Sequence, residues 1–243
     1  MTKQEQLITT QIADTVANQS AMQNIRSHII IIDGSSKSGK KTLAWELSLA
    51  LLYNSQKTAI VNTKDSTLTN AVLQRKKQTP YLPCPILINR KDFYDQANNF
   101  DAVIIPSVNS EDELSFYANT YITLIKKDTK TIQRFKNNLS YINNLWELKK
   151  KIASEHKRSL NWVVCENILS TAHTKNNSAT LSDLSKHYGF RLASPISYST
   201  CYQNSLQGIS SQDKEYPTLQ NQMTYEDVYN KREITKLAEF IFS

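Results

Sequence analysis

The residues best suited to bind a small molecule lie in one loop, at positions 34–42, with the sequence GSSKSGKKT. A glycine followed, after four residues, by Gly-Lys is the pattern of a phosphate-binding loop, in which consecutive backbone N–H groups surround a phosphate. The second glycine lets the backbone approach closely, and the lysine can reach the phosphate oxygens. The alternative is a serine-rich turn that only caps a helix. We predict that a nucleotide contacts Gly34, Ser35, Ser36, Lys37, Ser38, Gly39, Lys40, Lys41 and Thr42.

The loop lacks the hydroxyl group that normally holds a magnesium ion. A serine or threonine directly after the lysine ligates Mg²⁺ in such loops, but this chain has Lys41 there and a threonine only at Thr42. Neighbouring residues of a helix point about 100° apart, so Thr42 is a doubtful metal ligand. A second cation at Lys41 would also repel the metal. Magnesium is therefore a doubtful cofactor.

The acidic residue that would hold the metal from a later strand is missing as well. The strand expected at 100–105 runs directly into Pro106 and Ser107. The nearest acidic residues lie at 111–113, where they serve equally well as the first turn of a helix. Sequence alone thus predicts a phosphate site without its usual metal ligands.

The segments around the loop alternate between strands and helices. Short apolar runs rich in β-branched residues predict buried strands at 28–32, 58–61, 86–88, 100–105, 121–125 and 162–165. Apolar residues at helical spacing predict helices at 3–26, 40–54, 129–157, 181–188 and 225–242. This alternation predicts a doubly wound, mostly parallel α/β sheet. We expect a helical extension over 1–27 and one domain over 28–243.

Composition narrows the class of protein. With 40% hydrophobic and 21% charged residues, the chain has an ordinary globular composition. Three widely spaced cysteines favour reduced thiols over disulfides or a zinc site, which predicts a cytoplasmic protein. We find no apolar run of the ~18 residues that a membrane span needs and no secretion signal, so we expect no membrane partner. The net charge of +7 allows contact with a polyanion.

Several stretches resemble the ParA/MinD family of P-loop ATPases, and most closely its MipZ-like members, which place the division plane. The stretches are 28–42 with its continuation into 49–53 and 58–61, then 100–118, 161–170, 184–191 and 223–237. Low but continuous similarity covers about 28–240. The segments at 161–170 and 184–191 are the most specific to the family.

The resemblance implies a MinD-like P-loop NTPase fold with ATP at the first loop and a nucleotide-controlled homodimer. It further implies non-specific DNA binding, interaction with a ParB-like protein and inhibition of an FtsZ-like protein, in chromosome partitioning or cell division. By the same resemblance, Lys40 matches the phosphate-binding lysine and Asn167 matches an asparagine that contacts adenine.

Four family positions carry unusual residues here. Ser35 stands where the family has a signature lysine, and Lys37 is two residues away from it. Asn62 replaces the aspartate that prepares the hydrolytic water, and Pro106 replaces the later-strand aspartate. The glycine of the γ-phosphate switch is missing from 107–109.

Three hypotheses about function follow. The first is an ATP-binding regulator with weak or lost hydrolysis, so its status as an ATPase is uncertain. The second is an interaction protein that keeps only the ATPase fold, with Lys41 as an internal cation. The third is an active ATPase with unrecognised metal ligands such as Asp65 or Glu111. Basic clusters at 75–77, 126–127, 149–151 and 157–158 suit either a DNA surface or solvated helix faces.

Overall fold

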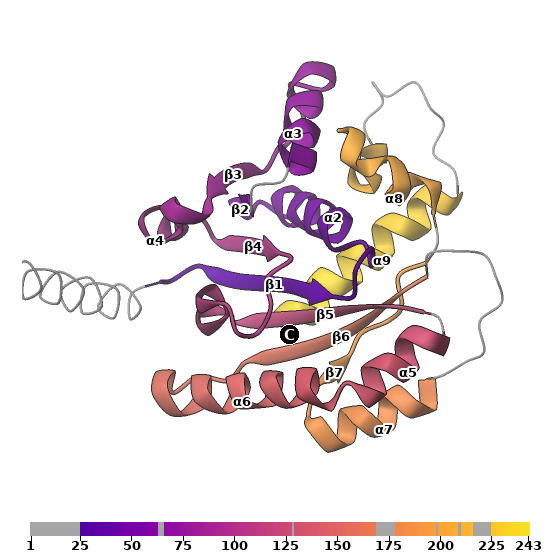
Figure 1. Cartoon of the computed structure of the whole chain (residues 1–243). Helices are drawn as coiled ribbons and strands as arrows, with labels where there is room; N and C mark the ends of the chain where they lie inside the picture. The colour runs from indigo at the N-terminus through magenta and orange to yellow at the C-terminus, as the bar shows by residue number, and fades with distance from the viewer. Residues whose placement is uncertain are drawn as a thin grey trace, which may run out of the picture.

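The structure, a computed structural model, describes residues 25–62, 66–127, 129–168, 178–197, 199–208, 210–215 and 225–243. Within these ranges, seven parallel strands form one sheet in the order β3-β2-β4-β1-β5-β6-β7 (Figure 1). The predicted helix at 3–26 falls almost wholly outside the described residues, as does Asp65. The strands are β1 (His28–Gly34), β2 (Thr58–Asn62), β3 (Ile86–Asn89), β4 (Ala102–Pro106), β5 (Thr120–Lys126), β6 (Asn161–Asn167) and β7 (Arg191–Leu192).

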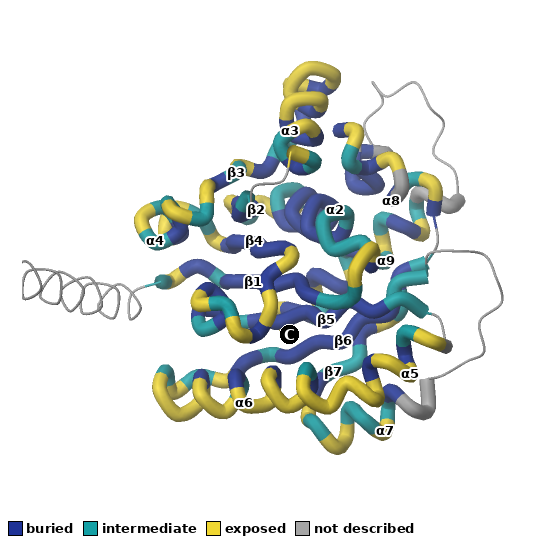
Figure 2. Tube along the Cα trace, in the orientation of Figure 1, coloured by how far each residue is buried: buried dark blue, intermediate teal, exposed yellow. Residues whose placement is uncertain are grey.

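Helices cover both faces of the sheet, as the alternation of elements predicts (Figures 1 and 2). Because successive side chains of a strand point to opposite faces, Ile29 and Ile31 of β1 join one hydrophobic cluster and Ile30 and Ile32 join the other. The first cluster includes α6 and α7, and the second includes α2 and α9. The helices are α2 (Lys40–Tyr53), α3 (Ser66–Gln78), α4 (Phe93–Gln96), α5 (Thr129–Asn137), α6 (Leu139–His156), α7 (Ser178–Tyr188), α8 (Thr200–Asn204) and α9 (Tyr225–Phe242).

One prediction about helices was wrong, and one helix was missed. The single helix expected at 129–157 is interrupted at Asn138, whose side chain accepts a hydrogen bond from the Tyr141 backbone N–H and so begins α6 as a new helix. Helix α3 was not predicted, although Leu68, Ala71 and Val72 have helical spacing and are buried. Within the described residues, no helix combines the length and apolarity needed to cross a bilayer.

Helix α2 is enclosed on nearly every side, because every residue from Leu43 to Leu51 is buried. One side packs on the sheet and α9, and the other side, with Trp45, packs on α3. The rest of α2 is covered by the chain after α8, which includes the short 3₁₀ helices Ser205–Gln207 and Ser211–Glu215 and which we call the carboxyl-terminal cover. The element that begins at the loop is therefore held by the carboxyl-terminal part of the chain.

A buried ion pair fixes this cover to α3. Both terminal nitrogens of Arg75 donate to Asp213, each at 2.6 Å, and both side chains are almost wholly inaccessible. The Tyr53 hydroxyl also donates to Asp213, at 2.6 Å. Neither interpretation of the basic cluster at 75–77, a DNA surface or a solvated helix face, holds for Arg75, whose charge is neutralised inside the protein.

Replacing Asp213 with asparagine is expected to destabilise the protein by ~3–5 kcal/mol, because it leaves the Arg75 guanidinium buried without a counter-charge. The matched control is Glu147→Gln, which breaks the exposed Glu147–Lys150 pair and should cost less than about 1 kcal/mol. Urea unfolding followed by circular dichroism measures both values. Equal effects of the two substitutions would contradict the structural role given to Asp213.

Candidate functional site

The glycine-containing loop lies at the carboxyl end of β1, the middle strand of the sheet. Ligands of open α/β sheets bind outside the carboxyl ends of the strands. Two glycines give the loop its shape, with φ of 140° at Gly34 and 93° at Gly39. A Cβ atom on Gly34 would collide with the Leu124 carbonyl, and one on Gly39 would lie 2.7 Å from the Asn167 amide nitrogen. Both positions therefore require glycine.

Lys40 closes the loop from the first turn of α2. Its ammonium group donates to the carbonyl oxygens of Gly34, at 3.0 Å, and Ser35, at 2.9 Å. Because an ammonium group has three protons, one donor remains that no described residue accepts. Burial lowers the pKa of Lys40, and the Asp33 carboxylate partly offsets this. The lysine thus spans the loop with one proton available for an anion.

Two serine hydroxyl groups inside the loop have no hydrogen-bond partner among the described residues. They are the buried Oγ atoms of Ser35 and Ser38, and Ser38 is wholly inaccessible. Buried polar atoms are nearly always paired, so orphaned ones need an explanation. Because both oxygens are covered from solvent, a phosphate would reach them only if the loop moved. Ser36 and Lys37 are exposed at the loop tip, where Lys37 has a left-handed φ of 57°.

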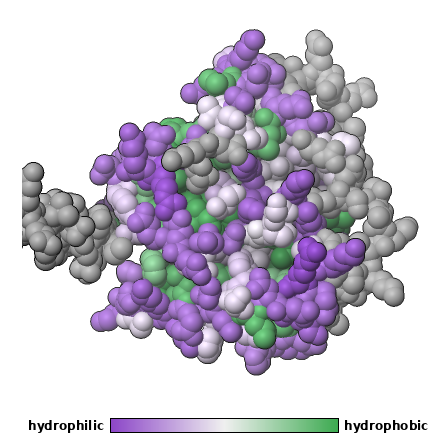
Figure 3. Space-filling model, in the orientation of Figure 1, coloured by the Kyte–Doolittle hydropathy of each residue, from purple (hydrophilic) through white to green (hydrophobic). Residues whose placement is uncertain are grey.

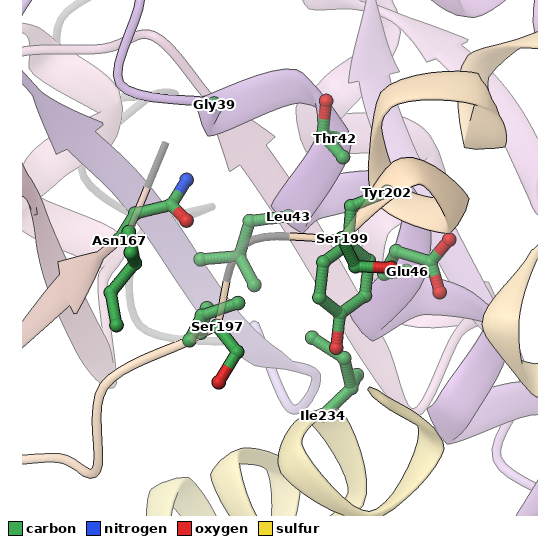
Figure 4. Close-up of a pocket in the computed structure, with 11 residues that line it drawn as sticks. Gly39, Thr42, Leu43, Glu46, Asn167, Ser197, Ser199, Tyr202 and Ile234 are labelled. Atoms are coloured by element: carbon green, nitrogen blue, oxygen red, sulfur yellow. The ribbon is translucent and has the colours of Figure 1, made fainter. Parts of the chain in front are cut away.

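The structure describes the surroundings of the candidate magnesium ligands Thr42 and Glu111. Thr42 lines a cavity on the α9 side of the loop (Figure 4), and no cluster of three or more His, Cys, Asp or Glu residues occurs in the described ranges. Asp112 caps a 3₁₀ helix and pairs with Arg90 at 2.6 Å, as the alternative interpretation of the acids at 111–113 predicts. Glu111 accepts a hydrogen bond from Asn144.

Asn167 is brought to the loop although it lies 127 positions after Lys40 in the sequence. It ends β6, and its side-chain nitrogen donates to the Ser38 carbonyl at 2.8 Å. Figure 4 shows its amide directed toward Gly39. The structure therefore places the predicted asparagine in contact with the predicted loop.

The cavity beside the loop has a volume of about 110 Å³. Leu43, Tyr202 and Ile234 give it apolar walls (Figure 4). A cavity of about 150 Å³ admits one benzene ring, so a purine base requires some widening here. Its lining residues are Gly39, Thr42, Leu43, Glu46, Asn167, Ile168, Ile196, Ser197, Ser199, Tyr202 and Ile234.

The far wall of the cavity is held by polar contacts to α9 that the sequence did not reveal. The backbone N–H and the hydroxyl of Ser197 both donate to Glu233, at 3.0 Å and 2.6 Å. Asn230 donates to the Ser199 hydroxyl at 2.6 Å, and its carbonyl accepts from Tyr202 at 2.7 Å. The contacts join α9 and the segment after β7, which are distant in sequence. No motif or spacing therefore indicates them, and only the fold brings them together.

Glu46 borders the same cavity from α2, and it is wholly buried. Its carboxylate accepts hydrogen bonds from the hydroxyls of Ser210 and Ser211, at 2.8 Å and 2.5 Å. Burial raises the pKa of Glu46 to about 7, although these hydrogen bonds oppose the shift. The residue therefore changes charge near neutral pH, at the contact between α2 and the carboxyl-terminal cover.

Comparison with models of known protein families shows the family of this chain. The model of the family described as "ATPase MipZ" matches residues 89–241, more than half of the 243 residues. The chain belongs to the MipZ family. The match starts after the loop at 34–42, so the case for phosphate binding there comes from this chain's own residues and fold. A search of curated protein sequences gives no significant match for this MipZ-family protein.

Solved structures share the fold of this MipZ-family protein at low sequence identity. A Cyanothece McdA variant in complex with ATP has a TM-score of 0.54 and 14% identity, over 90% of this chain and 97% of that one. The MinC:MinD cell division protein complex from Aquifex aeolicus has a TM-score of 0.54 and 13% sequence identity, and the match covers 89% of this chain and 96% of that one. A putative plasmid partition protein from Borrelia burgdorferi bound to AMPPNP has a TM-score of 0.51 and 13% sequence identity, and the match covers 89% of this chain and 98% of that one. The predicted MinD/ParA-like P-loop NTPase fold is confirmed.

Replacing Glu46 with glutamine is expected to remove a pH-dependent loss of stability. The ordinary pKa of 4.5 is raised to about 7 in the folded protein, so the folded state holds the proton more tightly than the unfolded state. The contribution of Glu46 to the free energy of unfolding is therefore fully present below pH 4.5 and is lost as the pH rises through 7. The loss is on the order of 1–3 kcal/mol. Urea unfolding of both proteins at pH 5 and pH 8 measures it as a difference. If the two proteins change equally between these pH values, Glu46 does not titrate as described.

Proposed function

We propose that this MipZ-family protein is an ATP-binding regulator of chromosome partitioning or division-site placement, with weak or absent ATP hydrolysis. The observation that carries the proposal is Lys40, which holds the loop between Gly34 and Ser35 and keeps a donor that no described residue accepts. ATP phosphates would bind along the loop, and the base would enter the cavity beside Asn167 and Tyr202.

Weak hydrolysis follows from the positions that lack a metal ligand. Phosphoryl transfer depends on charge neutralisation and on a positioned water molecule. Asn62 hydrogen-bonds to Thr69 within the protein, and Pro106 has no side-chain oxygen. By the family resemblance, each of these two positions normally has an aspartate. Asn62 and Pro106 have no carboxylate and cannot replace it. The proposed protein therefore responds to nucleotide chiefly by binding it.

The proposed partners follow from family membership and from the surface. We propose a nucleotide-dependent homodimer, ParB-like and FtsZ-like protein partners, and non-specific DNA contact. Lys149, Lys150 and Lys151 support DNA contact poorly, because they contact Gly189, Glu147 and the Phe116 ring. Lys126 and Lys127, at the end of β5, are better candidates. The face in Figure 3 is mainly hydrophilic with separate hydrophobic patches, which suits reversible contacts.

Calorimetric titration with ATP and ADP, with and without Mg²⁺, tests the proposal. We expect binding that changes little with Mg²⁺ and that Lys40→Ala weakens at least about tenfold, because a charge-assisted hydrogen bond is lost. The control is Lys57→Ala, which removes an exposed charge before β2. Absence of binding under every condition would favour the alternative, an interaction protein that retains only the fold.

Steady-state ATP turnover separates weak from active hydrolysis. We expect a rate close to background for the purified protein. A rate typical of active relatives that disappears with Lys40→Ala would contradict the proposed weak hydrolysis and leave nucleotide binding intact.

A further inference from the structure

A second cavity lies beside the loop, on the side of the sheet opposite the first one. It is formed by the end of β1, by β5, by α5 and by the start of α6. Its volume is about 430 Å³, which is within the range of small-molecule sites. Its lining includes Asp33, Ser35, Ile125, Arg134, Phe135 and Tyr141.

Asp33 provides a buried negative charge at this cavity, since it is only 9% exposed. The hydroxyls of Tyr121 and Tyr141 both donate to the same oxygen, Oδ2, at 3.0 Å. Burial, with the nearby carboxylate, raises the pKa of both tyrosines, so their hydroxyls remain donors. No described residue donates to the other oxygen, Oδ1. Because a carboxylate accepts up to about four hydrogen bonds, this oxygen can take a donor from a ligand.

Arg134 provides a positive charge on the same cavity. It is exposed on α5, and no acidic side chain among the described residues pairs with it. Ile125 and Phe135 give the cavity buried apolar surface. Lys40 interacts electrostatically with Asp33 but donates its hydrogen bonds to the loop carbonyls. The cavity thus combines a buried anion, an exposed cation and an apolar wall.

We propose that this cavity binds a small zwitterion with an apolar body, of the amino-acid or dipeptide class. Its ammonium group donates to Oδ1 of Asp33, its carboxylate pairs with Arg134, and its side chain packs against Phe135. A simple anion would face the Asp33 charge, and a simple amine would leave Arg134 unpaired. This proposal goes beyond nucleotide binding, and the cavity adjoins the loop because Gly34 and Ser35 line it.

Calorimetry on the full chain without nucleotide tests the proposal with four probes: L-phenylalanine, the dipeptide Phe-Gly, phenylalaninamide and N-acetylphenylalanine. We expect phenylalanine or Phe-Gly to bind with a dissociation constant below about 1 mM. Phenylalaninamide, which lacks the carboxylate, should bind at least about fivefold more weakly. N-acetylphenylalanine, which lacks the ammonium group, should not bind. If neither zwitterion binds, or if the acetylated probe binds equally well, the proposal is wrong.

Two variants assign the two ends of the ligand. Asp33→Asn should abolish binding of every probe that carries an ammonium group. Arg134→Gln should weaken the zwitterions to the level of phenylalaninamide and leave phenylalaninamide unchanged. The matched control is Arg232→Gln, an arginine of α9 outside the cavity. Because Arg134 is exposed, its variant remains informative if Asp33→Asn fails to fold. Equal weakening of all probes by Arg134→Gln would overturn the assignment.

Discussion

The pair of hydrogen bonds from Lys40 to the carbonyls of Gly34 and Ser35 is the interaction on which the site depends. It ties the first turn of α2 to the end of β1, so the loop keeps its curvature only while strand and helix keep their spacing. That spacing is fixed by the burial of α2, which is enclosed by the sheet, α3, α9 and the chain after α8. The geometry of a nine-residue loop is therefore a property of the whole domain.

Features set by neighbouring residues were predictable from the sequence. The β-branched run of β1, the two glycines and the apolar spacing of α2 lie within 26 residues, and each acts through local conformation. The parallel sheet followed from repeating strand–helix alternation. The site residue Asn167 was found only through family resemblance, because nothing local shows that the end of β6 meets the loop.

Features set by distant contacts were missed or misassigned. Arg75 belongs to a basic run that looks solvent-exposed, yet its partner Asp213 lies 138 residues away. The break at Asn138 depends on a side-chain cap that competes with a continuous helix. Glu233 and Asn230 shape the cavity wall from the last helix. The partners of Arg75 and of the cavity wall are remote in sequence, so the local pattern of apolar and polar residues cannot predict these contacts.

The strand order has a consequence for how this protein reaches its folded state. Strand β1 pairs with β4 and β5, which start some 70 and 90 residues later, so the loop has no rigid base until those segments are in place. Closing long chain segments is slow. During synthesis, β1 therefore emerges well before its partners, and the binding loop acquires its shape only once the chain through Lys126, the end of β5, has left the ribosome.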